Sequence, residues 1–196
     1  MSEARRVVVA SQNPGKVQEI ARMLPGWDVC SLGDFDPIAF PEEGSNYEAN
    51  ARAKALAAAR AIGLPCVADD SGLEVDALGG VPGPYSARYG GPGLDDRGRY
   101  EKLLEALTSE AEPRGARFYC VAACAWPDGT SVVADGECRG EILGAPQGDG
   151  GFGYDPVFRP DGFERGMAEI SKAEKDELSH RGRAFEALGP KMDDHA

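Results

Sequence analysis

The chain has 196 residues, of which 42% are hydrophobic and 28% are charged, and its formal net charge is -12. A chain of this length fits one globular domain with a substantial core. The negative charge argues against a general affinity for a DNA or RNA backbone, which needs clustered lysine and arginine. No apolar run approaches the ~18 residues that a membrane-spanning helix needs. We therefore expect a single soluble domain over residues 1–196, without a nucleic-acid or membrane partner.

The N-terminus and the cysteines indicate where the protein works. Basic residues precede an apolar stretch of only about four residues, against the roughly 7–15 of a signal-peptide core, so this stretch is interpreted as a first strand. The five cysteines are odd in number and contain no C-x-x-C pair. This pattern favours a reduced, cytoplasmic compartment over a disulfide framework or a zinc site.

Strand and helix signals alternate along the first half of the chain. Asn13 and Pro14 are typical of a helix N-cap followed by proline at the first helical position. Gly63 and Pro65 are typical of a helix end. In chain order, the predicted elements are a strand at Val7–Ala10, a helix at Pro14–Leu24, a strand at Trp27–Leu32, an alanine-rich helix at Asn46–Gly63, a short strand at Cys66–Ala68, a half-buried strand at Leu73–Leu78 and a tight turn at Gly79–Pro84.

The second half of the chain predicts an antiparallel addition to this pattern. Pro-Asp-Gly-Thr between two apolar runs indicates a hairpin, and Ser171 with Glu174 forms a capping box. The predicted elements are a helix at Asp95–Leu107, hairpin strands at Arg117–Trp126 and Ser131–Ala134, a further strand at Glu137–Leu143, a glycine-rich loop, a helix opened by Ser171, and a last helix from Ser179 to Gly189. The fold class is therefore α/β, a helix-flanked sheet with an antiparallel portion.

The segment SQNPGK, Ser11 to Lys16, joins the first strand to the first helix. A helix N-terminus offers free N–H groups and a positive dipole end, which suit phosphate. A P-loop would need Gly where Ala10 stands and Ser or Thr where Val17 stands. The segment is thus either an ordinary strand–helix turn or a phosphate site of another kind.

Two further segments carry charged and amide side chains. Asn50 and Lys54 are four residues apart and share one helix face, and Glu42 precedes that helix. Asp69 and Asp70 are adjacent where the short strand is expected to end. Adjacent carboxylates suit Mg²⁺, which takes one or two protein carboxylates plus phosphate oxygens, and one carboxylate can act as general base. An Asp-Ser-Gly turn is the alternative for this pair.

The last two segments bring aromatic and cationic groups. GDGGFGYDPVF combines glycines, which allow close approach to a ligand, with Phe152 and Tyr154. AEKDELSHRGR places Lys175, His180 and Arg181 near two helix starts. Core aromatics in a hairpin loop and a charged helix surface are the alternatives.

In this order the segments resemble the inosine/xanthosine triphosphate pyrophosphatase family, whose members clear non-standard purine nucleotides. The resemblance runs from Val7 to about Leu188. Its most specific pieces are ADDSGLEVDALGGVPGPYSARY, GGFGYDP and SHRG. Gln12 departs from the family pattern, which commonly has glycine there.

The resemblance implies an elongated, two-lobed mixed sheet flanked by helices, with an active-site cleft between the lobes, usually as a homodimer. It also implies Mg²⁺-dependent hydrolysis of ITP, dITP or XTP to the monophosphate and pyrophosphate. With the charges described above, it predicts Asp70 as the catalytic residue and Asp70, Glu42 and Asp69 around the metal. The predicted nucleotide-binding residues are Ser11, Gln12, Asn13, Pro14, Gly15, Lys16, Lys54, Ser71, Phe152, Gly153, Tyr154, Asp155, Lys175, His180 and Arg181.

Two other functions remain open from the sequence. One is a nucleotide-binding regulatory protein without turnover, which should tolerate loss of Asp70. The other is a Maf-like pyrophosphatase acting on modified pyrimidine nucleotides, although GGFGYDP and SHRG favour the purine enzymes. A Nudix hydrolase is not supported, because its G-x₅-E-x₇-R-E-like run is missing.

Overall fold

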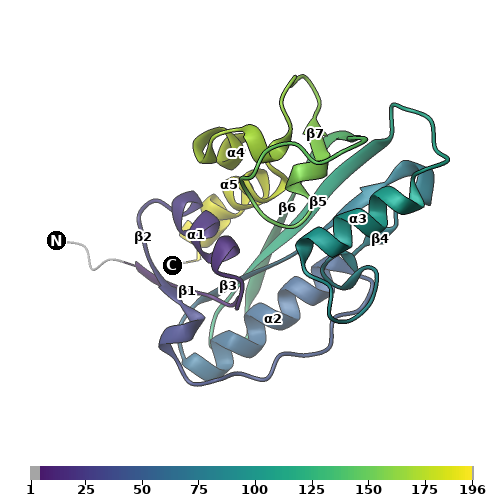
Figure 1. The fold of residues 1–196 in the computed structure, drawn as a ribbon. Coiled ribbons are helices and arrows are strands. Elements are labelled where there is room, and N and C mark those ends of the chain that lie inside the picture. The colour runs from purple at the N-terminus through teal and green to yellow at the C-terminus, as the bar shows by residue number, and fades with distance from the viewer. Residues whose placement is uncertain (1–4, 196) are drawn as a thin grey trace.

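In the computed structural model, which describes residues 5–195, one mixed sheet organises the molecule (Figure 1). Its strands follow the order β2-β1-β3-β5-β6-β7, with β4 paired to β3. β1 is parallel to β2 and β3, whereas the remaining pairs are antiparallel. The strands are β1 (Arg5–Val9), β2 (Trp27–Ser31), β3 (Cys66–Val75), β4 (Pro82–Gly83), β5 (Gly115–Ala125), β6 (Ser131–Ile142) and β7 (Phe158–Pro160).

Five α-helices flank this sheet. They are α1 (Pro14–Met23), α2 (Tyr47–Ile62), α3 (Asp96–Ala106), α4 (Lys172–Leu178) and α5 (His180–Asp193). Short 3₁₀ turns connect several elements. No helix among residues 5–195 is long and apolar enough to cross a membrane. The predicted α/β class with a mixed, helix-flanked sheet is confirmed.

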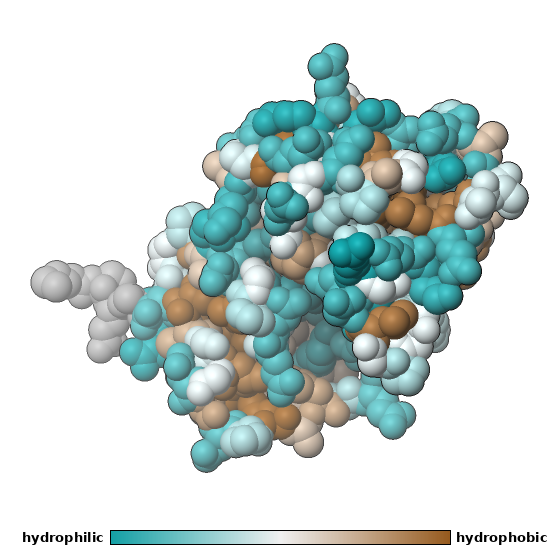
Figure 2. All heavy atoms as spheres, viewed as in Figure 1, coloured by the Kyte–Doolittle hydropathy of each residue, from teal (hydrophilic) through white to brown (hydrophobic). Residues whose placement is uncertain are grey.

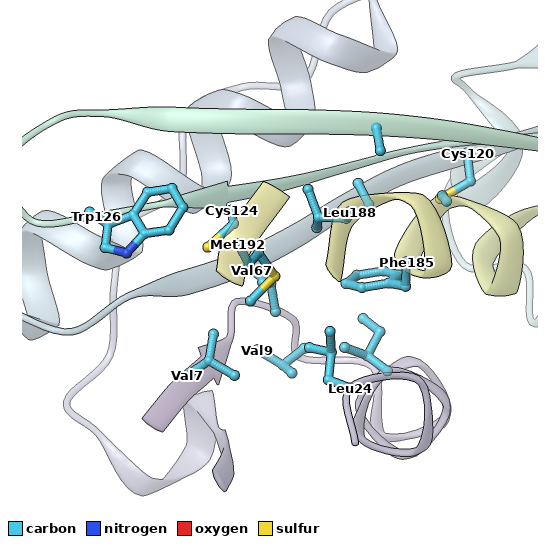
Figure 3. Packing of buried hydrophobic residues seen from close by; sticks show 14 residues of the cluster. Val7, Val9, Leu24, Val67, Cys120, Cys124, Trp126, Phe185, Leu188 and Met192 are labelled. Carbon is cyan, nitrogen blue, oxygen red and sulfur yellow. The ribbon is translucent and has the colours of Figure 1, made fainter. Parts of the chain in front are cut away.

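The alternation of β1 explains how helices cover both faces of the sheet. Val7 and Val9 pack with α1 and α5 on one face, whereas Val8 packs with the alanines of α2 on the other. Successive strand residues point to opposite faces, so a continuous valine run is what a doubly covered strand requires. Figure 3 shows the first of these layers, where Phe185 and Leu188 of α5 face β1 and α1.

The long strands extend beyond β1 and β2 and build a second half of the molecule. There, a separate cluster gathers Leu73 and Val75 of β3 with residues from α3, β5, β6 and the 154–167 region. Figure 1 shows α3 at one end of the long β5 and β6 strands and α2 at the other. The cores of the two halves therefore share one sheet.

One prediction about the sheet was wrong in an informative way. We expected a strand to end at Asp69 and another to begin at Leu73, but β3 runs unbroken through both aspartates. β5 pairs with it along its whole length, from Cys66 opposite Ala125 to Val75 opposite Ala116. The Asp-Ser-Gly sequence is typical of a turn, but the backbone pairing with β5 keeps this segment in the strand.

Other strand boundaries moved for the same reason, and the last helix is longer than expected. β6 is a single strand where two were expected, because β5 pairs with it from Gly115 to Ala125. Pro82–Gly83, expected to form part of a turn, instead adds a short strand to β3. The last helix continues past Pro190 to Asp193.

Candidate active site

The turn between β1 and α1 has the capping geometry that the sequence predicted. The side chain of Asn13 accepts hydrogen bonds from the backbone N–H groups of Gly15 and Lys16, at 2.9 and 3.3 Å. Pro14 occupies the start of the helix. Ser11 accepts from the N–H of Asn13. This rigid turn fixes the direction in which Lys16 leaves the helix.

Asp69 lies at the centre of a buried group of cations. Lys16 Nζ lies 3.1 Å from Asp69 Oδ2, and Arg181 NH2 lies at the same distance. Ser71 Oγ also donates to Oδ2. Burial alone would raise the pKa of Asp69, but Lys16, Arg181 and Lys54 together outweigh burial and hold that pKa well below its usual value. Asp69 is therefore an ion-pair partner that carries its charge at neutral pH.

The ionic network continues from Arg181 through Glu19. Glu19 of α1 accepts from Arg181 NH1 at 2.7 Å and lies 2.8 Å from Lys175 Nζ. Lys175 in turn reaches Asp155 Oδ2 at 2.6 Å. That Asp155 oxygen also accepts from the N–H of Phe152. The network thus ties α1, α4, α5 and the glycine-rich loop into one frame.

Asp70 points to the opposite side of β3 from Asp69, as neighbours on a strand must. Asn50 Nδ2 donates to its Oδ2 at 2.7 Å, and Lys54 Nζ lies 3.8 Å from its Oδ1. Lys54 is shared with Glu43, at 2.7 Å. Burial raises the pKa of Asp70, with Lys54 and Asn50 only partly opposing the shift. A buried carboxylate with a raised pKa is well suited to accept a proton.

The carboxylates match part of the donor set that Mg²⁺ requires. Asp70 and Glu43 both lie within 4 Å of one cation, the ammonium of Lys54, at 3.8 and 2.7 Å. Glu42 is exposed, and Asp69 is taken up by ion pairs on the other side of the strand. Residues 5–195 contain no group of three His, Cys, Asp or Glu side chains that could hold a metal. Two carboxylates suffice for Mg²⁺ when phosphate oxygens and water complete its shell.

A cavity of about 320 Å³ lies beside this network, and the face drawn in Figure 2 is hollowed near its centre. Lys175 Nζ lies 4.7 Å from the centre of the Phe152 ring. His180 stacks on Phe118 with ring centres 4.8 Å apart. Burial, with the charges of Arg181 and Lys175, lowers the pKa of His180 and keeps it neutral. The cavity therefore offers flat apolar surfaces beside fixed polar groups, as a heterocycle requires.

The structure brings most of the predicted binding residues to this cavity. Those that line it are Asn13, Lys16, Ser71, Phe152, Gly153, Tyr154, Asp155, Lys175, His180 and Arg181. Ser11, Gln12 and Pro14 instead line a neighbouring hollow of about 520 Å³. The Cβ that a larger residue would have at Gly15 would lie 3.0 Å from the Phe152 ring, so these two segments are in close contact.

Sequence reasoning missed several polar residues of the site. Glu19 lies three residues after Lys16 on α1, a spacing that places both on one helix face. Glu43 follows the predicted Glu42, and no sequence signal separates the two. Asp96 and Arg99 line the cavity from α3, a helix that carried no recognised motif.

Comparison with known proteins places the chain in a family. The Ham1 family pattern matches residues 7–191. The chain belongs to the Ham1 family. It is 51% identical over 189 residues to the dITP/XTP pyrophosphatase of Deinococcus deserti, covering 95% of this chain and 88% of that protein. It is 49% identical to the dITP/XTP pyrophosphatase of Syntrophobacter fumaroxidans, covering 95% and 82%.

A solved Ham1 structure agrees with the fold described here. The HAM1 protein from Coxiella burnetii superposes with a TM-score of 0.85 at 38% identity, covering 96% of this chain and 98% of that one. The family resemblance carried by the sequence motifs is therefore confirmed. The cavity, the buried aspartates and the cation network thus belong to a protein of the Ham1 family.

Proposed function

We propose that this Ham1 protein hydrolyses non-standard purine nucleoside triphosphates, namely dITP, ITP and XTP, to the monophosphate and pyrophosphate. The names of its relatives support this substrate class. The observation that carries the proposal is Asp70, a buried carboxylate with a raised pKa held by Asn50 and Lys54. It directly precedes Ser71, which lines the cation-rich cavity. A binding protein has no need for a proton acceptor in that place.

The phosphate groups bind at the end of the site formed by α1, Lys16 and Lys54. The helix N-terminus and the two ammonium groups offset the negative charge of the triphosphate, which the chain's overall charge of -12 would otherwise repel. Their position beside Asp70 also suits stabilisation of the departing pyrophosphate. Ser11 to Gly15 contribute by forming the turn that positions Lys16, because the N–H groups of Asn13 and Gly15 are already bonded within it.

Asp70 acts as general base on the attacking water. With no metal bound, burial raises its pKa, which favours uptake of the proton that the water gives up. Asn50 Nδ2 binds one of its oxygens, which leaves the other oxygen to accept that proton. The attack forms a new bond at the α-phosphorus and breaks the bond to the bridging oxygen of the pyrophosphate.

Mg²⁺ is the cofactor that this donor set suits. Asp70 and Glu43 would hold it, with Glu42 the nearest further carboxylate along the chain. When bound, the ion supplies charge neutralisation and polarises the phosphate or its water. Asp69 is not proposed as a ligand, because its oxygens already serve Lys16 and Arg181.

The purine ring occupies the cavity beside Phe152 and His180. Neutral His180 donates a ring N–H to the 6-oxo group of hypoxanthine or xanthine. Adenine carries a donor there and is disfavoured. Arg181 has its guanidinium bound by Asp69, Glu19 and Ser71, so we assign it to holding the cavity wall.

The protein acts as a homodimer in the cytoplasm. Light scattering at working concentration tests the dimer.

The decisive experiment is a nucleotide panel with Mg²⁺ in which pyrophosphate and orthophosphate are detected separately. We expect ITP, dITP and XTP to exceed ATP in kcat/KM by at least about 10²-fold, the low end of discrimination by paired polar groups. Pyrophosphate should be the first product. Turnover confined to modified pyrimidine triphosphates would favour the Maf-like alternative, and binding without turnover would favour a regulatory protein.

A further inference from the structure

Two buried side-chain nitrogens among residues 5–195 have no hydrogen-bond partner, and both belong to residues that line the same cavity. One is Nδ1 of His180, already assigned to the base. The other is Nε of Arg99. Buried polar atoms without partners are rare in folded proteins. Their occurrence in one cavity indicates that a ligand supplies what the protein leaves unpaired.

Arg99 is held in place at the cavity wall. Its NH1 donates to Asp96 Oδ1 at 3.0 Å, and Asp96 Oδ2 accepts from the N–H of Gly153 at 2.7 Å. Only 23% of the Arg99 side chain is exposed. Asp96 thereby connects the guanidinium to the loop that carries Phe152. The Nε–H is a fixed donor, not the end of a mobile surface chain.

The neighbouring polar groups are already occupied. Ser86 Oγ donates to the carbonyl of Gly83 and accepts from the N–H of Leu73. The hydroxyl of Tyr154 donates to the carbonyl of Ser86. Of the described residues at the α3 end of the cavity, Arg99 is therefore the one with a buried donor still available to a ligand.

Figure 1 shows α3 well separated from the α4–α5 pair, so the two approach the cavity from different sides. In a purine whose position 6 faces His180 on α5, position 2 lies on the same ring edge, so it can face the α3 side of the cavity. Xanthine has an oxo acceptor at position 2, hypoxanthine has hydrogen, and guanine has an amino donor. A guanidinium donor can hydrogen-bond the oxo group of xanthine, has no partner on hypoxanthine, and meets a second donor on guanine.

We propose that Arg99 reads position 2 of the purine, favouring xanthosine triphosphate and rejecting GTP. This inference rests on the proposed function and adds what that function leaves open, since the 6-oxo group alone cannot separate xanthine from guanine. Asp96 is the positioning residue that holds Arg99 and the loop together.

The test measures kcat/KM for XTP, ITP and GTP in the wild type, in Arg99→Met and in Arg97→Met. Methionine keeps the length of the stem and removes the donors. A hydrogen bond to a charged group predicts that the XTP/ITP ratio falls about 10- to 100-fold in Arg99→Met. The GTP/ITP ratio should rise. Arg97 lies on the same helix but is exposed and paired with Glu101, so its variant should keep the wild-type ratios.

An unchanged XTP/ITP ratio in folded Arg99→Met would overturn the inference while leaving the proposed function intact. Failure of the wild type to hydrolyse either XTP or ITP would overturn the proposed function itself, so the two failures are distinguishable. If Arg99→Met does not fold, Arg99→Lys carries the test. Lysine keeps the charge but lacks the fixed Nε–H, and the same ratio must fall.

Discussion

Asp69 and Asp70 are neighbours in the chain with opposite electrostatic surroundings. Asp69 is matched by Lys16 and Arg181 and has a lowered pKa, whereas burial outweighs the cation near Asp70 and raises its pKa. The strand directs one carboxylate to each side of the sheet. Asp69 therefore stabilises the fold through its ion pairs, whereas the raised pKa of Asp70 suits a proton acceptor.

Replacing Asp70 by Asn should remove activity without lowering stability. Loss of a general base costs roughly 10²–10⁴-fold, and a weakened metal site adds to this loss. The folded-state pKa is raised, so the charged carboxylate opposes folding at neutral pH, and its removal should leave the free energy of unfolding equal or higher. Kinetics and urea unfolding test both parts. Near-normal turnover would contradict the role of Asp70.

Replacing Asp69 by Asn should lower the free energy of unfolding at neutral pH. Breaking this buried ion pair removes one of the two carboxylates that Arg181 binds, the other being Glu19, and should cost up to about 3–5 kcal/mol. The pKa of Asp69 is lowered on folding, so its stabilisation is present above the unfolded value of about 3.9 and is lost as pH falls toward the folded one. Urea unfolding at neutral pH and below pH 4 should show the difference between variant and wild type shrinking. A difference independent of pH would refute this account.

At the scale of elements, backbone contact positions the cation-bearing helix. α5 begins at His180 and packs on β6 so closely that a Cβ at Gly136 would lie 2.4 Å from the His180 carbonyl oxygen and 2.6 Å from the Ala184 nitrogen. No side chain fits between the strand and the helix. Gly136 therefore fixes where His180 and Arg181 stand relative to the cavity.

Gly136→Ala should displace α5 and reduce both stability and turnover. Overpacking of this kind typically costs about 1–3 kcal/mol of stability. Because His180 is displaced as well, kcat/KM for ITP should fall further than the loss of folded protein alone explains. Gly189→Ala is the matched control, because it lies in the same helix and its Cβ would meet no residue beyond its chain neighbours. Its effect on stability should be small, because the gain of alanine over glycine in a helix is opposed by the crowding that Pro190 imposes on the residue before it. Equal effects of the two substitutions would contradict the packing argument.

Elements with local signals were predictable from the sequence, and elements set by partner strands were not. The cap at Asn13 and the left-handed Gly63 that ends α2 were visible in the residues themselves. The continuity of β3 through Asp69 and Asp70 depends on β5, which lies about fifty residues further along the chain. The site followed the same rule. Its motif-bearing loops were identified, but Arg99 was not, because only the fold brings α3 to the cavity.

At the scale of the whole molecule, the site joins the two halves of the sheet. Lys16 and Glu19 come from α1, beside the core around β1, whereas Asp96 and Arg99 come from α3, beside the core around Leu73. The long strands β3 and β5 run through both halves. A nucleotide bound in the cavity as proposed would contact elements of both halves at once, so its binding energy should stabilise the entire fold.

Nucleotide binding should therefore raise the stability of both halves together. The test uses Asp70→Asn, which slows turnover, with ITP at about one hundred times its Kd. A ligand that binds only the folded state adds about 2.7 kcal/mol to the free energy of unfolding at that concentration. Hydrogen exchange should then slow in α1 and in α3 alike, because both contribute residues to the cavity. Protection confined to the α1 side would show that only the triphosphate is held, and would contradict a base bound between Phe152 and α3.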